Sequence, residues 1–211
     1  MKITVTGASE LKLPAECAVV SLTVSLTGTD RADIVARTAA IVDQVRDALT
    51  AAIADGAGRD LRLSNLRTWT NVLHDDRGRQ GETQHVAEVR GTVTFDDLSR
   101  LGDVLGGLSV AEGVNVNHVS WELREETMRR LQPEALRAAY ADATTRATWI
   151  AEAAGFTTVT VASVQDNGRQ VYRGAGKTAM FMEIGGSVPS IRLDPEDVDV
   201  SADLTIRFRA S

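Results

Sequence analysis

Apolar and polar residues alternate along several short stretches of the chain, a pattern typical of strands that bury one face. The clearest case is residues 198–209, where Val198, Val200 and every second residue to Phe208 are apolar or small and the intervening residues are polar. The same alternation occurs at residues 2–6, 20–27, 84–95 and 119–123, and residues 60–73 form a further strand-like run. The chain is therefore expected to contain several half-buried strands.

Apolar spacings of three and four residues predict helices in three other places. Residues 34–52 predict a long amphipathic helix that Asp30 caps and that ends near Gly56. Asp96-Asp97 precedes a shorter helix that carries leucines from Leu98 to Leu108. Strands and helices in mixed order, with hairpin-like strand pairs, predict an α+β fold with mostly antiparallel sheets and helices packed on one face.

The third predicted helix runs from Pro133 to Ala154 and is rich in alanine. Proline is tolerated in the first turn of a helix, so Pro133 indicates the start, and Gly155 is typical of a left-handed cap at the end. The apolar face is expected at the following positions, which recur at three and four: Leu136, Tyr140, Ala143, Ala147, Ile150 and Ala154. The many alanines permit a close approach to a sheet or to another helix.

Charge and composition exclude several classes of protein. The net charge is −6 and no Lys/Arg cluster occurs along the sequence, which argues against a nucleic-acid partner. No apolar run approaches the ~20 residues of a membrane-spanning helix. The single cysteine, Cys17, cannot form an internal disulfide. Residues 1–6 enter a strand without a signal-peptide pattern, which predicts a cytoplasmic protein.

Two glycine-containing segments imitate nucleotide-binding motifs but are incomplete. Val5-Thr6-Gly7-Ala8-Ser9 resembles the start of a short-chain dehydrogenase, yet no glycine follows in residues 10–14 and neither tyrosine is followed by lysine four residues later. Gly174-Ala175-Gly176-Lys177-Thr178 resembles the end of a phosphate-binding loop, but Val171 stands where the first glycine is required. Neither segment predicts a cofactor.

The titratable residues show no spacing that is typical of a catalytic or metal site. His74, His85 and His118 could approach a metal together with Asp75 or Asp76, but none has helical ligand spacing. Adjacent carboxylates such as Glu125-Glu126 face opposite ways on a strand, and before a helix they usually cap it. We therefore expect no catalytic residue, no cofactor and no metal, and a protein that is not an enzyme.

An apolar run interrupts the polar, Gly-rich stretch at residues 166–196. It contains Met180, Phe181, Met182 and Ile184. One interpretation is a short strand on a sheet edge. The other is an interaction patch that docks on a neighbouring subunit or a partner protein, because methionine-rich surface adapts well to partners.

The whole chain resembles the SIMPL-domain family, a bacterial and animal family of largely unknown function. The resemblance depends on Val5-Thr6-Gly7 with Pro14 and Ala18, on the alanine-rich helix up to Gly155, and on the last strand after Pro195-Glu196. The chain departs from the family at Gly7-Ala8-Ser9 and Pro14-Ala15, and residues 1–6 show no pattern of the signal peptide that many exported members carry. The resemblance implies two small α/β-sandwich lobes, self-assembly and no established catalytic residues.

These observations lead to two hypotheses about organisation and function. Residues 1–211 are expected to form one SIMPL-type unit, or two intertwined lobes in which the chain ends form one and about residues 75–125 the other. The leading functional hypothesis is a self-assembling interaction or scaffold protein. Such a protein would form a homo-oligomer and could also bind a protein partner. The alternative is a small-molecule binding protein whose ligand lies between the two lobes.

Overall fold

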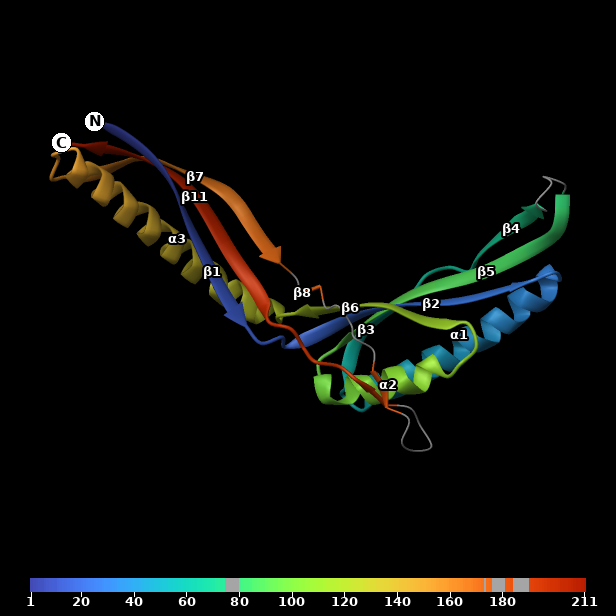
Figure 1. Cartoon of the computed structure of the whole chain (residues 1–211). Helices are drawn as coiled ribbons and strands as arrows, with labels where there is room; N and C mark the ends of the chain where they lie inside the picture. Colours follow the sequence, from blue (N-terminus) through green and yellow to red (C-terminus); the bar gives the residue numbers. More distant parts are fainter. Residues whose placement is uncertain (75–79, 173, 176–180, 184–189) are drawn as a thin grey trace. The chain divides into compact units, whose positions relative to one another are not determined.

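A computed structural model of the chain describes residues 1–74, 80–172, 174–175, 181–183 and 190–211 (Figure 1). The expected α+β class with mostly antiparallel sheets is confirmed. The chain divides into two compact units. Unit 1 comprises Met1–Ala15, Glu122–Ala175 and Glu196–Ser211, and unit 2 comprises Glu16–Trp121 and Gly176–Pro195.

The sheet of unit 2 is built around the long strand β5 (Gln80–Phe95). On one side β5 pairs antiparallel with β2 (Cys17–Gly28), and β6 (Val114–Glu122) lies beyond β2. On the other side β5 pairs in succession with β3 (Gly58–Leu63) and β4 (Arg67–His74). The strand-like run at residues 60–73 is thus two strands. Residues 64–66, which are not in a strand, separate the two. β3 is itself irregular, because its ladder with β5 shifts register between Arg59 and Arg62 and Asp60 has a φ of 56°.

Two helices of unit 2 begin at the predicted aspartate caps. In α1 (Arg31–Ala54), the Asp30 carboxylate accepts from the backbone N–H groups of Ala32 at 2.8 Å and Asp33 at 3.2 Å. In α2 (Leu98–Ser109), the Asp97 carboxylate accepts from the N–H of Ser99 at 3.0 Å. Helix α1 packs on β2 and β5, and α2 lies beside it (Figure 1).

Thr38 is a buried polar residue on the sheet-facing side of α1. It is fully buried, and its hydroxyl oxygen has no hydrogen-bond partner in the described part of the chain. A buried hydroxyl without a partner costs about 1–3 kcal/mol. We expect Thr38→Val to raise the free energy of unfolding by about 1 kcal/mol in urea denaturation. Thr38→Ser, which keeps the hydroxyl and removes the methyl group, should lower it instead, and an unchanged stability in Thr38→Val would contradict this interpretation.

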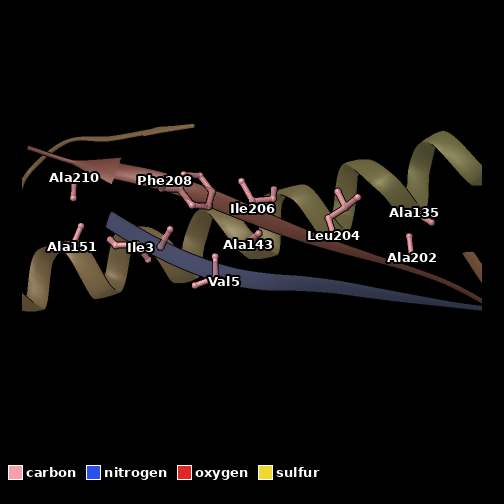
Figure 2. Close-up of a cluster of buried hydrophobic side chains, with 12 residues drawn as sticks. Ile3, Val5, Ala135, Ala143, Ala151, Ala202, Leu204, Ile206, Phe208 and Ala210 are labelled. Atoms are coloured by element: carbon pink, nitrogen blue, oxygen red, sulfur yellow. The ribbon is translucent and has the colours of Figure 1, made fainter. Parts of the chain in front are cut away.

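Unit 1 contains a three-stranded antiparallel sheet in the order β1-β11-β7. The strands are β1 (Lys2–Leu13), β11 (Val198–Ala210) and β7 (Val159–Tyr172). Strands from the two ends of the chain pair directly, with Val5 opposite Ile206. Side chains alternate across this sheet: odd-numbered residues of β1 and even-numbered residues of β11 are turned towards helix α3 (Glu125–Ala153) (Figure 2).

The buried face of α3 is a row of alanines, and this corrects the predicted face. The buried alanines are spaced by four and comprise Ala135, Ala139, Ala143, Ala147 and Ala151 (Figure 2). Of the residues expected on that face, Ala143 and Ala147 are confirmed as buried. Tyr140, Ile150 and Ala154 are exposed. A row spaced by four follows one ridge of the helix surface, and the small alanines let that ridge lie against the strands. Side-chain size therefore selects the buried face here, because the larger apolar residues do not fit between the backbones.

The start of α3 also differs from the prediction. The helix begins at Glu125, and Pro133 lies inside it. The two glutamates of the first turn interact favourably with the helix dipole, and Leu131 is buried, so the first two turns are stabilised independently of the proline. Pro133 is exposed, and the carbonyl that loses its N–H partner can therefore be reached by water. The end is as predicted, since Gly155 has a φ of 83°.

Three short strands follow β7 where the structure describes this stretch: β8 (Gly174–Ala175), β9 (Phe181–Glu183) and β10 (Ser190–Arg192). β9 pairs antiparallel with β10, and Ile191 of β10 is buried against α2. A side chain at Gly102 of α2 would overlap the carbonyl oxygen of Ile191, so glycine permits this close approach. Among the described residues, no helix is both long and apolar enough to cross a membrane.

Candidate interaction surface

The predicted interaction patch is only partly covered by the structure. Met180 and Ile184 lie outside the described residues. Phe181 and Met182 belong to β9, where they pair through the backbone with Arg192 and Ile191. The strand pairing agrees with the interpretation of a short strand, although the partner is β10 and not a sheet edge. Docking of the patch on a partner stays a prediction.

Titratable side chains in the described part of the chain do not gather into a metal site. No group of three or more His, Cys, Asp or Glu residues there is close enough to hold an ion. His85 lies 3.1 Å from the hydroxyl of Thr70 on the neighbouring strand, and His118 is on β6. Asp75 and Asp76 lie outside the described residues. Cys17 is buried.

Shifted pKa values occur at exposed ion pairs and at a helix cap. The Glu112 carboxylate accepts two hydrogen bonds from the Arg37 guanidinium, at 2.7 and 2.8 Å, and this raises the pKa of Arg37. Hydrogen bonds from Ser99 lower the pKa of Asp97. These contacts hold α1 to the segment after α2 and fix the start of α2, so each has a structural role.

An apolar surface lies where α3 stops covering its sheet. Helix α3 packs closely on β1 and β11 and touches β7 only slightly. Val161 and Val164 of β7 are directly opposite Phe208 and Ile206, which belong to the core beneath the helix. The two valines are nevertheless 43% and 51% exposed. The face that is core on β11 is therefore open on β7.

The flank of α3 that adjoins these valines can be identified from its contacts. On one side of the alanine row, Asp142 accepts from the N–H of Ala8 at 3.1 Å, so this flank faces β1. On the other side, Leu136 lines a cavity of about 50 Å³ together with Asp166 and Gly168, so this flank faces β7. Successive positions spaced by four on the β7 flank are Leu136, Tyr140, Thr144 and Thr148.

We call Val161, Val164 and this flank of α3 the β7 strip. Its threonine hydroxyls donate within the helix: Thr144 to the carbonyl of Tyr140 and Thr148 to the carbonyl of Thr144, both at 2.9 Å. The threonines can therefore present their methyl groups outward. Tyr140 adds an aromatic ring that is 41% exposed. The strip is an apolar surface built from two elements that are adjacent in the sequence.

Sequence reasoning did not identify the β7 strip. The ladder between β7 and β11 shifts between Arg207 and Phe208, so Ala162 is an extra residue in β7. This bulge puts Val161 and Val164 on the same face although three positions separate them. The alternation that normally indicates a strand face is broken there, which left the two valines without a recognisable pattern.

A groove of about 410 Å³ lies within unit 2 between α1 and α2. Its walls include Val45 and Leu108, with Gln44 and Asp103 as polar groups. Gly107 also lines the groove, and a methyl group added there would meet no atom within 4 Å. The volume is sufficient for a small ligand. The groove is separate from the β7 strip, since it belongs to the other unit.

Comparison with known proteins gives the family of the chain. A search of curated proteins found no match. The model of the SIMPL family, described as "Protein of unknown function (DUF541)", matches residues 3–208. The match covers nearly the whole chain and both units. The chain therefore belongs to the SIMPL family.

Proposed function

We propose that this protein is a self-assembling interaction protein in which unit 1 associates with a second copy through the β7 strip. The observation that carries the proposal is the exposure of Val161 and Val164 on a face that is buried core one strand away. Contiguous exposed apolar surface of this kind is typical of protein–protein contact sites. The SIMPL family is described as one of unknown function, so the match favours no other activity.

The composition of the first half of β7 favours contact along this side of the sheet. Residues 159–165 contain no charged residue and no proline, which are the usual means of protecting an edge strand. The opposite edge strand, β1, carries Lys2, Glu10 and Lys12. The bulge at Ala162 interrupts the edge of β7 itself. The proposed contact therefore uses the apolar face of β7 and the flank of α3 rather than a backbone ladder between copies.

A two-fold interface would bring the same residues together from both copies. We expect the double variant Val161→Thr/Val164→Thr to weaken self-association about 1,000-fold. Threonine keeps the branched shape that suits a strand, but four hydroxyls would be buried at about 1 kcal/mol each, and 1.4 kcal/mol corresponds to a factor of ten. Light scattering and sedimentation over a concentration series measure the change.

Val110→Thr is the matched control, because Val110 is the most exposed of the large apolar residues in the described chain, at 66%, and belongs to unit 2. It should leave association unchanged. Circular dichroism verifies that the double variant is folded. A wild-type protein that remains monomeric at high concentration, or a folded double variant with the wild-type mass, would remove the support for the proposal. A ligand held between the two lobes stays a prediction.

A further inference from the structure

We propose that the outer face of the unit 1 sheet, the face turned away from α3, binds a diphosphate group at Lys2, Arg207 and Arg209. The register of β1 and β11 puts Lys2 directly opposite Arg209 and Thr4 directly opposite Arg207. All three cations are exposed and share one face. They come from the two ends of the chain, which is why the sequence shows no basic cluster.

The three cations are close enough to act on one ligand. Residues directly opposite on an antiparallel pair have Cβ atoms about 5 Å apart, and alternate residues on one strand are about 7 Å apart. Within the described chain, none of the three takes part in an ion pair. Two neutral hydroxyls flank the arginines, since Thr160 lies opposite Arg209 and Ser163 lies opposite Arg207 on β7.

The carboxylates of this face lie towards its other end. Asp203 is four residues from Arg207 along β11, with Thr205 between them on the same face. Further along, Lys12 contacts Glu10 at 3.3 Å and Asp199 at 3.8 Å, so these groups largely neutralise one another. The outer face is thus positive at the end where Lys2 pairs with Arg209 and acidic towards the other end.

This arrangement is unfavourable for an empty sheet. Like charges directly opposite each other destabilise a strand pair. The chain has 29 acidic and 23 basic residues, so carboxylates are plentiful, yet among the described residues no acidic side chain stands opposite these cations or next to them on this face in the register of β1 and β11. Protection of an edge strand accounts for a lysine on β1, but β11 is the central strand and has no edge to protect. A bound anion would remove the repulsion.

The chemistry of the side chains favours a phosphate ligand over a simple halide or carboxylate. Arginine presents a planar fork of donors that matches phosphate oxygens in two-point contacts. Two such forks on one strand, with an ammonium group beside them, can hold two linked phosphoryl groups, and the hydroxyls of Thr4 and Ser163 offer further donors. The ligand class is therefore a diphosphate, as in pyrophosphate or a nucleoside diphosphate. This inference does not depend on the β7 strip, which lies on the other face.

The first test is the melting temperature of the full chain in pyrophosphate, with sodium chloride and sodium sulfate at matched ionic strength as references. Pyrophosphate at ten times its Kd should raise the melting temperature by roughly 3 °C, and calorimetry should give one site per chain. Arg209→Gln should melt higher than the wild type without ligand at low salt, because the repulsion with Lys2 is gone, and should bind pyrophosphate at least tenfold more weakly. The rise in melting temperature reports the repulsion alone, whereas the loss of affinity distinguishes a binding site, because an arginine that binds no anion would leave the pyrophosphate affinity unchanged.

Arg207→Gln provides a second variant with the same expected loss of binding. Arg137→Gln is the control, since Arg137 is an exposed cation on α3 of the same unit, and its pyrophosphate affinity should equal that of the wild type. Equal shifts in sulfate and pyrophosphate at matched ionic strength would mean ionic screening alone and would overturn the proposal. Wild-type affinity in both Arg209→Gln and Arg207→Gln would also overturn it. A nucleoside diphosphate that binds more tightly than pyrophosphate would support the site and identify the source of the diphosphate.

Discussion

Gly7→Ala is expected to lower the free energy of unfolding by about 2–3 kcal/mol, although it adds one methyl group. Gly7 of β1 is buried under α3. A Cβ atom there would lie 2.7 Å from the Cβ of Ala143 and closer still to the carbonyl oxygen of Ala139. Because the carbonyl is part of the helix backbone, no side-chain rotation can relieve the overlap, and the whole helix must move away from the strand. Urea denaturation, followed by circular dichroism, measures the loss.

Gly107→Ala is the matched control for this prediction. Gly107 is an exposed residue of α2, and a methyl group there meets no atom within 4 Å. Alanine should raise stability at that position by about 0.5–1 kcal/mol, because it is the better helix former. The same substitution is thus expected to have opposite signs at the two glycines. Similar effects at both positions would contradict the close packing of α3 on β1.

The close approach at Gly7 also explains how α3 is attached to β1. The N–H of Ala8 donates to the Asp142 carboxylate, the Ser9 hydroxyl donates to the carbonyl of Ala135 at 2.8 Å, and Arg146 donates to the carbonyl of Thr6. These bonds reach across only because the glycine and the alanine row bring the two backbones together. Overpacking at Gly7 would therefore break polar contacts as well as apolar ones. For this reason the expected loss of unfolding free energy is larger than the volume of one methyl group alone would predict.

Features that depend on neighbouring residues could be predicted from the sequence. Alternation identified β11 and β2, and the aspartates at positions 30 and 97 identified the starts of α1 and α2 because a cap acts within three residues. Gly155 identified the end of α3 for the same reason. The α+β class followed from the order of these elements.

Features that depend on distant residues could not be predicted. The pairing of β1 with β11 joins residues about 200 positions apart, and no local pattern contains that information. The alanine face of α3 is selected by the strands it meets, whereas the sequence alone favoured the larger residues Tyr140 and Ile150. Pro133 predicts a helix start, because the sequence does not show that the preceding acidic turn is already helical.

The candidate surfaces also divide into those that depend on neighbouring residues and those that depend on distant ones. The β7 strip was hidden by the bulge at Ala162, and the cations at Lys2 and Arg209 become neighbours only through the sheet register. The predicted patch at residues 180–184, by contrast, is a continuous apolar run. Such a run can be recognised in the sequence whether or not it forms a surface in the fold. Surfaces assembled from separate elements require the fold before they can be recognised.

Phe208→Ala is expected to have the largest effect on stability, about 3–5 kcal/mol, which is the usual range for removing a buried phenylalanine ring. Phe208 of β11 is 1% exposed and lies with Ile3, Val5 and Ile206 in the core beneath α3 (Figure 2). Alanines supply most of the helix side of this core, so small side chains cannot move in to fill the space that the ring leaves. The loss should fall near the upper end of the range.

Hydrogen exchange measured by mass spectrometry can localise this effect. The described residues of the core that contains Phe208 all belong to unit 1, so Phe208→Ala should reduce protection in β1, β11 and α3 and leave β2, β5 and α1 protected. Phe95→Ala, at an equally buried phenylalanine of β5, is the matched variant and should give the reverse pattern. Equal loss of protection in both units for either variant would show that the two cores unfold as one cooperative structure, and the separate-core interpretation would then be wrong.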